Sequence, residues 1–262
     1  MKEGEYGNMK KVMLVFGTRP EAIKMCPLVK ELKIRKNIEV KVCVTGQHRE
    51  MLQQVLECFD VVPDYNLEIM KDKQTLFDIT TNIISKIKPV LEKEMPDIVL
   101  VHGDTTTTFV TSLCAFYMQI PVGHVEAGLR TYNIYSPTEK AKQNLLNEGK
   151  NESQIYVTGN TAIDALKTTV KANYNNPILD WVGENRLIVL TAHRRENLGK
   201  PLEQMFTAIK RILDEYDDIK VIYPIHKNPL VRETANKIFK YSNKIKLIEP
   251  LEVLDFHNFL NK

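Results

Sequence analysis

Short runs of apolar, β-branched residues alternate with amphipathic helical segments along almost the whole chain of 262 residues. The first apolar run, 12–17, is followed at once by Thr-Arg-Pro-Glu at 18–21. Proline at a first helical position and glutamate in the first turn are both typical of a helix start. Strands that alternate with helices build parallel sheets covered by helices, because each crossover returns the chain in the same direction. The pattern therefore predicts an α/β protein.

The boundaries of these segments can be estimated from the same alternation. Expected strands are 12–17, 40–45, 97–101, 122–125, 154–158, 187–191, 220–223 and 245–248. Expected helices begin near residue 19 and then at 51–59, 76–91, 107–117, 161–170, 202–216, 229–239 and 253–260. In the first helix, the helical period predicts a buried stripe formed by Ile23, Pro27, Leu28 and Leu32.

A break in the alternation divides the chain in two. Residues 171–185 contain Asn-Asn-Pro and Gly-Glu-Asn, a composition typical of a linker or hinge. We expect an N-terminal Rossmann-like domain at 1–174, a linker at 175–185 and a C-terminal Rossmann-like domain at 186–262. The last of these looks incomplete, because it holds only three strand–helix units. Ligands of open α/β sheets bind at the carboxyl ends of strands, so the expected site is a cleft between the domains.

The charge balance and the cysteine pattern exclude several classes of protein. The chain has 36 basic and 33 acidic side chains, a formal net charge of +3, which is too balanced to indicate nucleic-acid binding. No run approaches the roughly twenty apolar residues of a membrane-spanning helix. Residues 1–11 have no apolar signal core, and the four cysteines have no C-x-x-C spacing. Both features favour a cytoplasmic protein with reduced, buried thiols.

The loops that leave the expected strands are rich in reactive side chains. Neither a G-x-G-x-x-G dinucleotide motif nor a P-loop motif occurs in the sequence. The turn 17–21 and the threonine run 105–108 instead begin helices with free backbone N–H groups, which predicts anion binding. A diphosphate suits these turns together with nearby cations and donors, which are Arg19, Lys24, His193 and Arg194.

Two carboxylates, Asp104 and Glu126, end strands close to glycine residues, which let a ligand approach. A pair of acidic side chains near histidine can supply the base and the acid that proton removal from carbon requires. Two other interpretations remain open: Asp104 caps the next helix, and His102 is a packed strand residue.

A metal site is a third interpretation of this region. Its ligands would be His102, Asp104, His124 and Glu126, since imidazole and carboxylate are common metal ligands. The sequence has no histidine pair at i, i+4 and no cysteine set, which disfavours this interpretation. We therefore expect no metal.

Five motifs follow one another in the strand-end loops. They are FGTRPEAIK at 16–24, TGQH at 45–48, VHGDT at 101–105, GHVEAGLRT at 123–131 and HRRE at 193–196. In this order they resemble the non-hydrolysing UDP-N-acetylglucosamine 2-epimerases, and the similarity runs from about residue 10 to residue 262. The resemblance implies a GT-B-type fold of two Rossmann-like domains. It also implies interconversion of UDP-N-acetylglucosamine and UDP-N-acetylmannosamine for surface polysaccharide precursors, through loss of UDP to 2-acetamidoglucal, with no cofactor.

The resemblance also implies roles for individual residues. Catalytic positions are matched by Asp104, Glu126 and His193. Substrate-binding positions are matched by Arg19, Lys24, Asp104, Glu126, His193 and Phe256. Gln47 and His226 match positions where bacterial members bind a second UDP-N-acetylglucosamine as activator. Members are commonly homodimers, so the expected partners are UDP-N-acetylglucosamine, UDP and a second copy of the chain.

The chain departs from this pattern at two places. The resemblance implies a segment with another catalytic glutamate after Pro137, but Thr138 follows directly, and motifs that hold ribose and diphosphate are missing after Lys262. We hypothesise that this sequence consists of separate stretches of a longer protein, joined directly at Pro137 and Thr138. The alternatives are a non-catalytic nucleotide-sugar-binding remnant, if 262 residues are the whole protein, a GT-B glycosyltransferase, and a hydrolysing epimerase.

Overall fold

The chain folds into two units. The computed structural model describes residues 9–46, 49–71, 73–127, 138–192 and 198–262. The first unit is Met1–Thr168 and the second is Thr169–Lys262. The junction between Pro137 and Thr138, and the loop residues Gln47 and His193, lie outside the described residues.

A five-stranded parallel sheet forms the centre of the first unit. Its strands are β1 (Lys10–Phe16), β2 (Ile38–Val44), β3 (Tyr65–Asn66), β4 (Ile98–His102) and β5 (Val122–Val125). They are ordered β3-β2-β1-β4-β5. From β1 the chain adds β2 and β3 on one side of the sheet and then β4 and β5 on the other, so the strand order reverses between β1 and β4. In open α/β sheets, ligands bind beyond the carboxyl ends of the strands at the point where the strand order reverses. The strand order therefore predicts a ligand site at the loops that follow β1 and β4.

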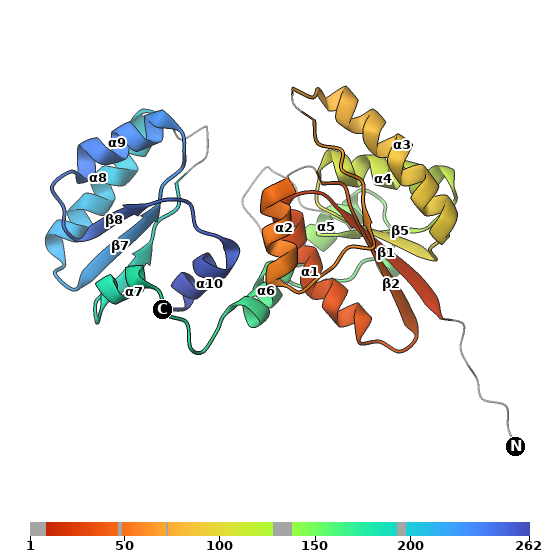
Figure 1. Ribbon diagram of the computed structural model, residues 1–262, viewed down its shortest axis with the longest axis horizontal. Coiled ribbons are helices and arrows are strands. Elements are labelled where there is room, and N and C mark those ends of the chain that lie inside the picture. Colours follow the sequence, from red (N-terminus) through yellow and green to blue (C-terminus); the bar gives the residue numbers. More distant parts are fainter. Residues whose placement is uncertain (1–8, 47–48, 72, 128–137, 193–197) are drawn as a thin grey trace, which may run out of the picture. The chain divides into compact units, whose positions relative to one another are not determined.

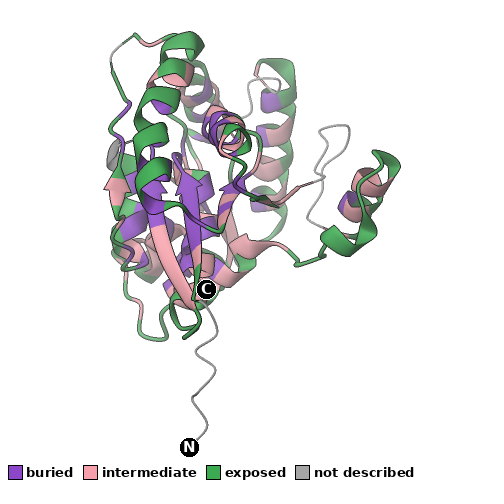
Figure 2. Cartoon of the chain, turned by 90° about the vertical axis from the view of Figure 1, so that its right-hand side faces the viewer, coloured by how far each residue is buried: buried purple, intermediate pink, exposed green. Residues whose placement is uncertain are grey.

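Helices cover both faces of this sheet, as Figure 1 shows. On one face lie α1 (Arg19–Lys33) and α2 (Arg49–Cys58), and on the other lie α3 (Leu76–Glu94) and α4 (Thr106–Tyr117). Met13 and Val15 of β1 belong to the core on the α3–α4 side, as the two-residue period of a strand requires. In Figure 2 the buried strands lie between helices whose outer faces are exposed. The predicted α/β class, with parallel sheets flanked by helices, is confirmed.

The predicted buried stripe of the first helix is wrong. The buried apolar residues of α1 are Ala22, Met25, Cys26 and Val29. These positions also have helical spacing, and their side chains are fully buried. The predicted stripe residues Ile23, Pro27, Leu28 and Leu32 are all only partly buried.

The predicted strand at 154–158 is also absent from the described structure. The chain there forms a short 3-10 helix, Glu152–Gln154, followed by irregular backbone. Tyr156 is 80% exposed. A β-branched or aromatic run becomes a strand only where a neighbouring strand and a packed face receive it, and this run has no ladder partner among the described residues. Two helices flank it, α5 (Glu139–Asn147) and α6 (Thr161–Thr169).

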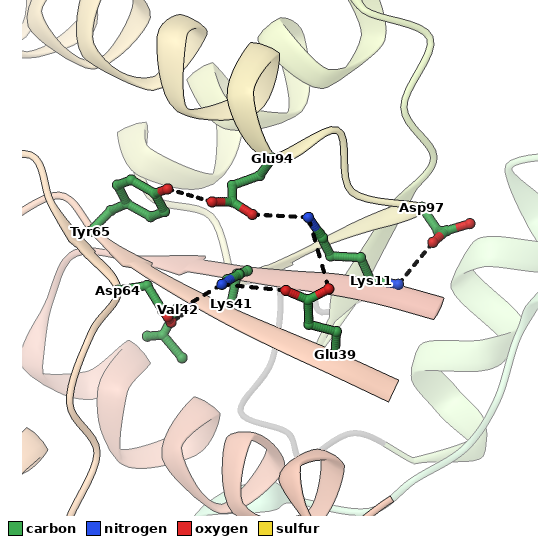
Figure 3. A network of polar contacts seen from close by, with 8 residues as sticks. All are labelled: Lys11, Glu39, Lys41, Val42, Asp64, Tyr65, Glu94 and Asp97. Carbon is green, nitrogen blue, oxygen red and sulfur yellow. Dashed lines mark hydrogen bonds and ion pairs between the residues drawn. The ribbon is translucent and has the colours of Figure 1, made fainter. Parts of the chain in front are cut away.

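A network of polar side chains lies at the amino-terminal ends of the strands of the five-stranded sheet (Figure 3). The Glu94 carboxylate accepts a hydrogen bond from the Tyr65 hydroxyl and one from Lys11 Nζ at 3.1 Å. Lys11 Nζ also lies 3.9 Å from Glu39, and its backbone N–H donates to Asp97. The Tyr65 hydrogen bond keeps the pKa of Glu94 below its usual value in spite of burial. The network therefore stabilises the end of the sheet that lies opposite the candidate site loops, which follow the carboxyl ends of the strands.

The second unit has a three-stranded parallel sheet in the order β6-β7-β8. Its strands are β6 (Arg186–Val189), β7 (Ile219–Pro224) and β8 (Ile245–Ile248). Val221 and Tyr223 of β7 pack in the core cluster of α8 (Lys200–Glu215) and α9 (Pro229–Phe239). Ile222, between them, packs in the cluster of α7 (Pro177–Val182) and α10 (Val253–Asn261). The predicted linker segment, 175–185, contains α7.

The four cysteines are free thiols, and Cys26, Cys43 and Cys114 are buried as predicted, whereas Cys58 is only partly buried. Burial raises the pKa of Cys26 and of Cys43 to about 12 each, so neither is a reactive thiolate at neutral pH. Within the described ranges, no helix combines the length and the apolar character needed to cross a bilayer.

Candidate active site

The ends of β4 and β5 bring two predicted carboxylates to one edge of the first sheet. In the parallel register His102 pairs with Val125, so Asp104 and Glu126 follow neighbouring strand ends. The Gly103 N–H donates to the Val125 carbonyl at 3.2 Å. His124 Nε2 lies 2.7 Å from the Gly103 carbonyl oxygen. These contacts join the two loops that carry the carboxylates.

The Glu126 carboxylate is enclosed by two groups from other elements. Its side chain is 5% exposed, and Lys24 Nζ of α1 donates to Oε2 at 2.6 Å. The His102 ring nitrogen Nε2 lies 3.1 Å from the same oxygen, at ion-pair distance but without the alignment of a hydrogen bond. The second oxygen, Oε1, is buried and has no hydrogen-bond partner in the described part of the chain. A buried acceptor without a partner is unusual, and it is available for a proton or a ligand.

Opposing effects set the protonation state of Glu126. Burial on its own would raise the pKa of this carboxyl group. The contacts with His102 and with the Lys24 ammonium group outweigh burial and hold the pKa below its ordinary value. Glu126 is therefore a carboxylate at neutral pH, the form that can accept a proton.

The backbone of Glu126 is left-handed, with φ of +59°. A residue with a Cβ adopts this conformation at a cost of about 1 to 2 kcal/mol. Strain of this kind persists where the surrounding structure fixes it, and it occurs often in active sites. The turn after β5 thus holds the carboxylate beside Lys24 and His102.

Asp104 is exposed, in contrast to Glu126, and follows Gly103, whose φ is +67°. Asp104 does not cap the next helix, so that interpretation is wrong. The cap of α4 is Thr105, whose hydroxyl accepts from the Thr108 N–H at 3.2 Å. His102 is a packed strand residue, as one interpretation held, but its ring also faces the carboxylate of Glu126.

The predicted anion site at the start of α1 is filled by the protein itself. Glu21 is 2% exposed, and its Oε2 accepts from the N–H groups of Gly17 at 2.8 Å and Thr18 at 2.7 Å. The free donors expected in this turn are therefore not free for phosphate. Sequence reasoning used Glu21 only as a sign of a helix start. The T-x-x-E spacing of Thr18 and Glu21, a capping-box pattern, was the signal that could have revealed its role.

The remaining predicted residues are spread over both units. Arg19 is the first residue of α1 and is partly exposed, one turn before Lys24. In the second unit, His226 is exposed after β7, and its Nδ1 accepts from the Asn228 N–H at 3.1 Å. Phe256 is partly buried on α10. The structure thus brings Lys24 and Glu126 together, with His102, which the predicted site did not include.

No group of three or more histidine, cysteine or acidic side chains is arranged to hold a metal ion in the described ranges. The contact of His102 with Glu126 has only one imidazole and one carboxylate, and Lys24 occupies the same oxygen.

Comparison with known proteins connects this site to one family. The family model described as UDP-N-acetylglucosamine 2-epimerase matches residues 30–139 and 135–262. The two matches meet at 135–139, where the chain departs from the expected order of motifs. A UDP-N-acetylglucosamine 2-epimerase of Bacillus subtilis is 57% identical over 272 residues, which cover 96% of this chain and 72% of the relative.

Solved structures agree with the sequence comparison. A crystal structure of a protein from Listeria monocytogenes described as a UDP-N-acetylglucosamine 2-epimerase superposes with a TM-score of 0.88 at 52% identity, covering 96% of this chain and 72% of that one. The Neisseria meningitidis epimerase, solved with UDP-GlcNAc bound, gives a TM-score of 0.82 at 44% identity, with coverage of 96% and 76%. The chain therefore belongs to the UDP-N-acetylglucosamine 2-epimerase family and is an isomerase.

Proposed function

We propose that this protein interconverts UDP-N-acetylglucosamine and UDP-N-acetylmannosamine without hydrolysis, for the synthesis of surface polysaccharide precursors. In the forward direction a base takes the C2 proton, the C1–O bond breaks, and UDP leaves with the electron pair. The product of this step is 2-acetamidoglucal, with a double bond between C1 and C2. UDP then adds back to C1, and C2 receives a proton on the opposite face. The sequence is redox-neutral.

One observation supports this chemistry more than any other: the buried, ionised Glu126 carboxylate has one oxygen held by Lys24 and one oxygen without a hydrogen-bond partner among the described residues. The held oxygen fixes the orientation of the group, and the other oxygen is available for proton transfer. A pKa below the ordinary value keeps the group charged at neutral pH. The hydrogen at C2 is not next to a carbonyl, so proton removal requires simultaneous stabilisation of the leaving group.

The other predicted residues have complementary roles in this proposal. Asp104, from the neighbouring strand end, is the second proton-transfer group, because inversion at C2 requires transfer on two faces. Arg19 and His193 bind the diphosphate, and Phe256 packs against the uracil base. Gln47 and His226 are the proposed contacts of a second UDP-N-acetylglucosamine that acts as activator.

The function is tested by NMR spectroscopy of UDP-N-acetylglucosamine incubated with the intact protein in deuterated water. We expect deuterium at C2, the appearance of the manno isomer, and no free N-acetylmannosamine. Release of the free sugar and UDP would instead identify a hydrolysing epimerase. Sugar transfer to an added acceptor without epimerisation would identify a glycosyltransferase, and binding without turnover would identify a non-catalytic remnant.

We also propose that the protein is a cytoplasmic homodimer. The free cysteines fit a reducing compartment.

An aromatic surface on α4 supports self-association: Phe109 is 65% exposed, Phe116 73% and Tyr117 72%. Phe109 and Phe116 are seven residues apart and therefore share one helix face. Phe116→Asp should shift the sedimentation coefficient from dimer to monomer, whereas a monomeric wild-type protein would contradict the proposal.

A further inference from the structure

A buried carboxylate that has no part in the proposed chemistry connects two loops of the site. Glu21 Oε2 accepts from the backbone N–H groups of Gly17 and Thr18, at the end of β1 and the start of α1. Its other oxygen, Oε1, accepts from the Thr105 hydroxyl at 2.5 Å. Thr105 lies 84 residues further along the chain, in the loop between β4 and α4. One side chain therefore joins the two loops that flank the reversal point of the sheet.

These two loops carry the groups on which the proposed reaction depends. Thr18 is followed directly by Arg19, and Thr105 is preceded directly by Asp104. The Glu21 carboxylate thus bonds the neighbour of one site residue to the neighbour of the other. Thr105 is also the cap of α4 and accepts from the Thr108 N–H, so its hydroxyl cannot turn without loss of a second hydrogen bond.

The protein contains a second capping carboxylate that provides a comparison. In α3, Asp78 accepts from the N–H and the hydroxyl of Thr75, three residues before it, and both residues are exposed. Asp78 bonds only to its own helix start, and its role is local. Glu21 is 2% exposed and bonds to the loop that follows the neighbouring strand, β4. Burial of a charge is favourable only when several donors satisfy it, and here three donors do so.

We propose that Glu21 is a positioning residue of the epimerase site, which sets the separation of the β1–α1 and β4–α4 loops through Thr105. This inference rests on the proposed function. It makes no claim that Glu21 touches the substrate. The carboxylate acts through the backbone of one loop and a hydroxyl group of the other, and thereby fixes Asp104 relative to Arg19.

Four variants test the connection by steady-state kinetics. Glu21→Gln and Thr105→Val should each lower kcat at least 10-fold, because a displacement of about 1 Å at reacting groups costs about 10²-fold in rate. KM should change less than 3-fold, since Arg19 stays on α1. Thr105→Ser keeps the hydroxyl and should retain kcat within about 2-fold. Asp78→Asn, the matched capping variant, should also retain it.

The double variant separates positioning from simple destabilisation. If Glu21 acts through Thr105, Glu21→Gln combined with Thr105→Val should lose no more kcat than the worse single variant. Additive losses would overturn the proposal. So would a kcat within 2-fold of wild type in folded Glu21→Gln and Thr105→Val proteins, with folding checked by circular dichroism and by UDP binding.

A readout that needs no turnover keeps this inference distinct from the proposed function. In ¹H–¹⁵N NMR spectra, Thr105→Val should shift the amide signals of Gly17 and Thr18, while Asp78→Asn should leave them in place. Unchanged Gly17 and Thr18 signals in Thr105→Val would overturn the link between the loops. A wild-type protein that shows the link but does not epimerise would refute the proposed function and the kinetic role of Glu21, while the structural link would stand.

Discussion

Replacement of Glu126 by glutamine should lower kcat for 2-epimerisation by about 10³-fold while UDP still binds. Glutamine keeps the size of the side chain but cannot accept a proton at the position of Oε1. Asp104→Asn should cause a loss of similar size, because the second face of C2 then has no proton-transfer group. Incorporation of deuterium at C2 measures turnover, and isothermal titration with UDP measures binding. Near-normal turnover in both variants would contradict the assignment.

Matched variants make this result specific. Glu92 is another glutamate paired with a lysine, but it is half exposed on α3, where its Oε1 lies 2.7 Å from Lys88 Nζ. Glu92→Gln should leave kcat unchanged.

Lys24→Met removes a cation that lowers the pKa of Glu126, so the pKa of Glu126 should rise. Activity depends on the ionised form, and the acid limb of the kcat profile should therefore move to higher pH than in the wild type. An unmoved limb would show that another group titrates.

Gly17→Ala should reduce the free energy of unfolding by about 2 to 3 kcal/mol and lower the unfolding midpoint by roughly 5 to 10 °C. A Cβ at residue 17 would lie 2.0 Å from Thr45 Oγ1 and 2.7 Å from Thr107 Oγ1. Both threonines are fully buried, and their hydroxyl oxygens are 3.1 Å apart in a hydrogen bond. Neither can move away without losing that bond. Thermal unfolding followed by circular dichroism measures the effect.

Gly149→Ala is the control for this prediction. Gly149 has φ of +76° and no atom within 4 Å of the Cβ site, so alanine there meets only backbone strain, about 1 to 2 kcal/mol. Thr45→Ala should partly restore the stability of Gly17→Ala, because it removes the nearest atom. An equal loss in Gly17→Ala with or without Thr45→Ala would show that the clash is not the cause.

The alternation of strands and helices was sufficient to predict the α/β class and most element positions. The helix at 229–239 and the strands at 122–125 and 245–248 were predicted to the residue. The same reasoning failed for 154–158, where apolar β-branched residues have no neighbouring strand in the described structure. Propensity is local, whereas a strand depends on a partner far away in sequence.

The placement of two candidate carboxylates was predictable, because each follows directly from a strand end. Asp104 and Glu126 could be placed together because neighbouring parallel strands end at one edge. The contacts that hold the two loops and the Glu126 carboxylate in place could not be predicted, since Lys24 reaches Glu126 across 102 residues and Thr105 reaches Glu21 across 84. Only the packed fold brings such groups together. For the same reason, the apparent anion site at residues 17–21 could not be recognised as occupied by an internal carboxylate.

The left-handed backbone at Glu126 has a consequence for how this site persists through sequence drift. Glycine would relax that turn, and asparagine tolerates it better than glutamate does. Either substitution would nevertheless remove the partner of Lys24 in a largely buried ion pair, and breaking such a pair costs more than the roughly 1 to 2 kcal/mol of strain that is relieved. Selection for stability alone therefore does not displace glutamate at position 126, and the strained side chain that handles the proton persists.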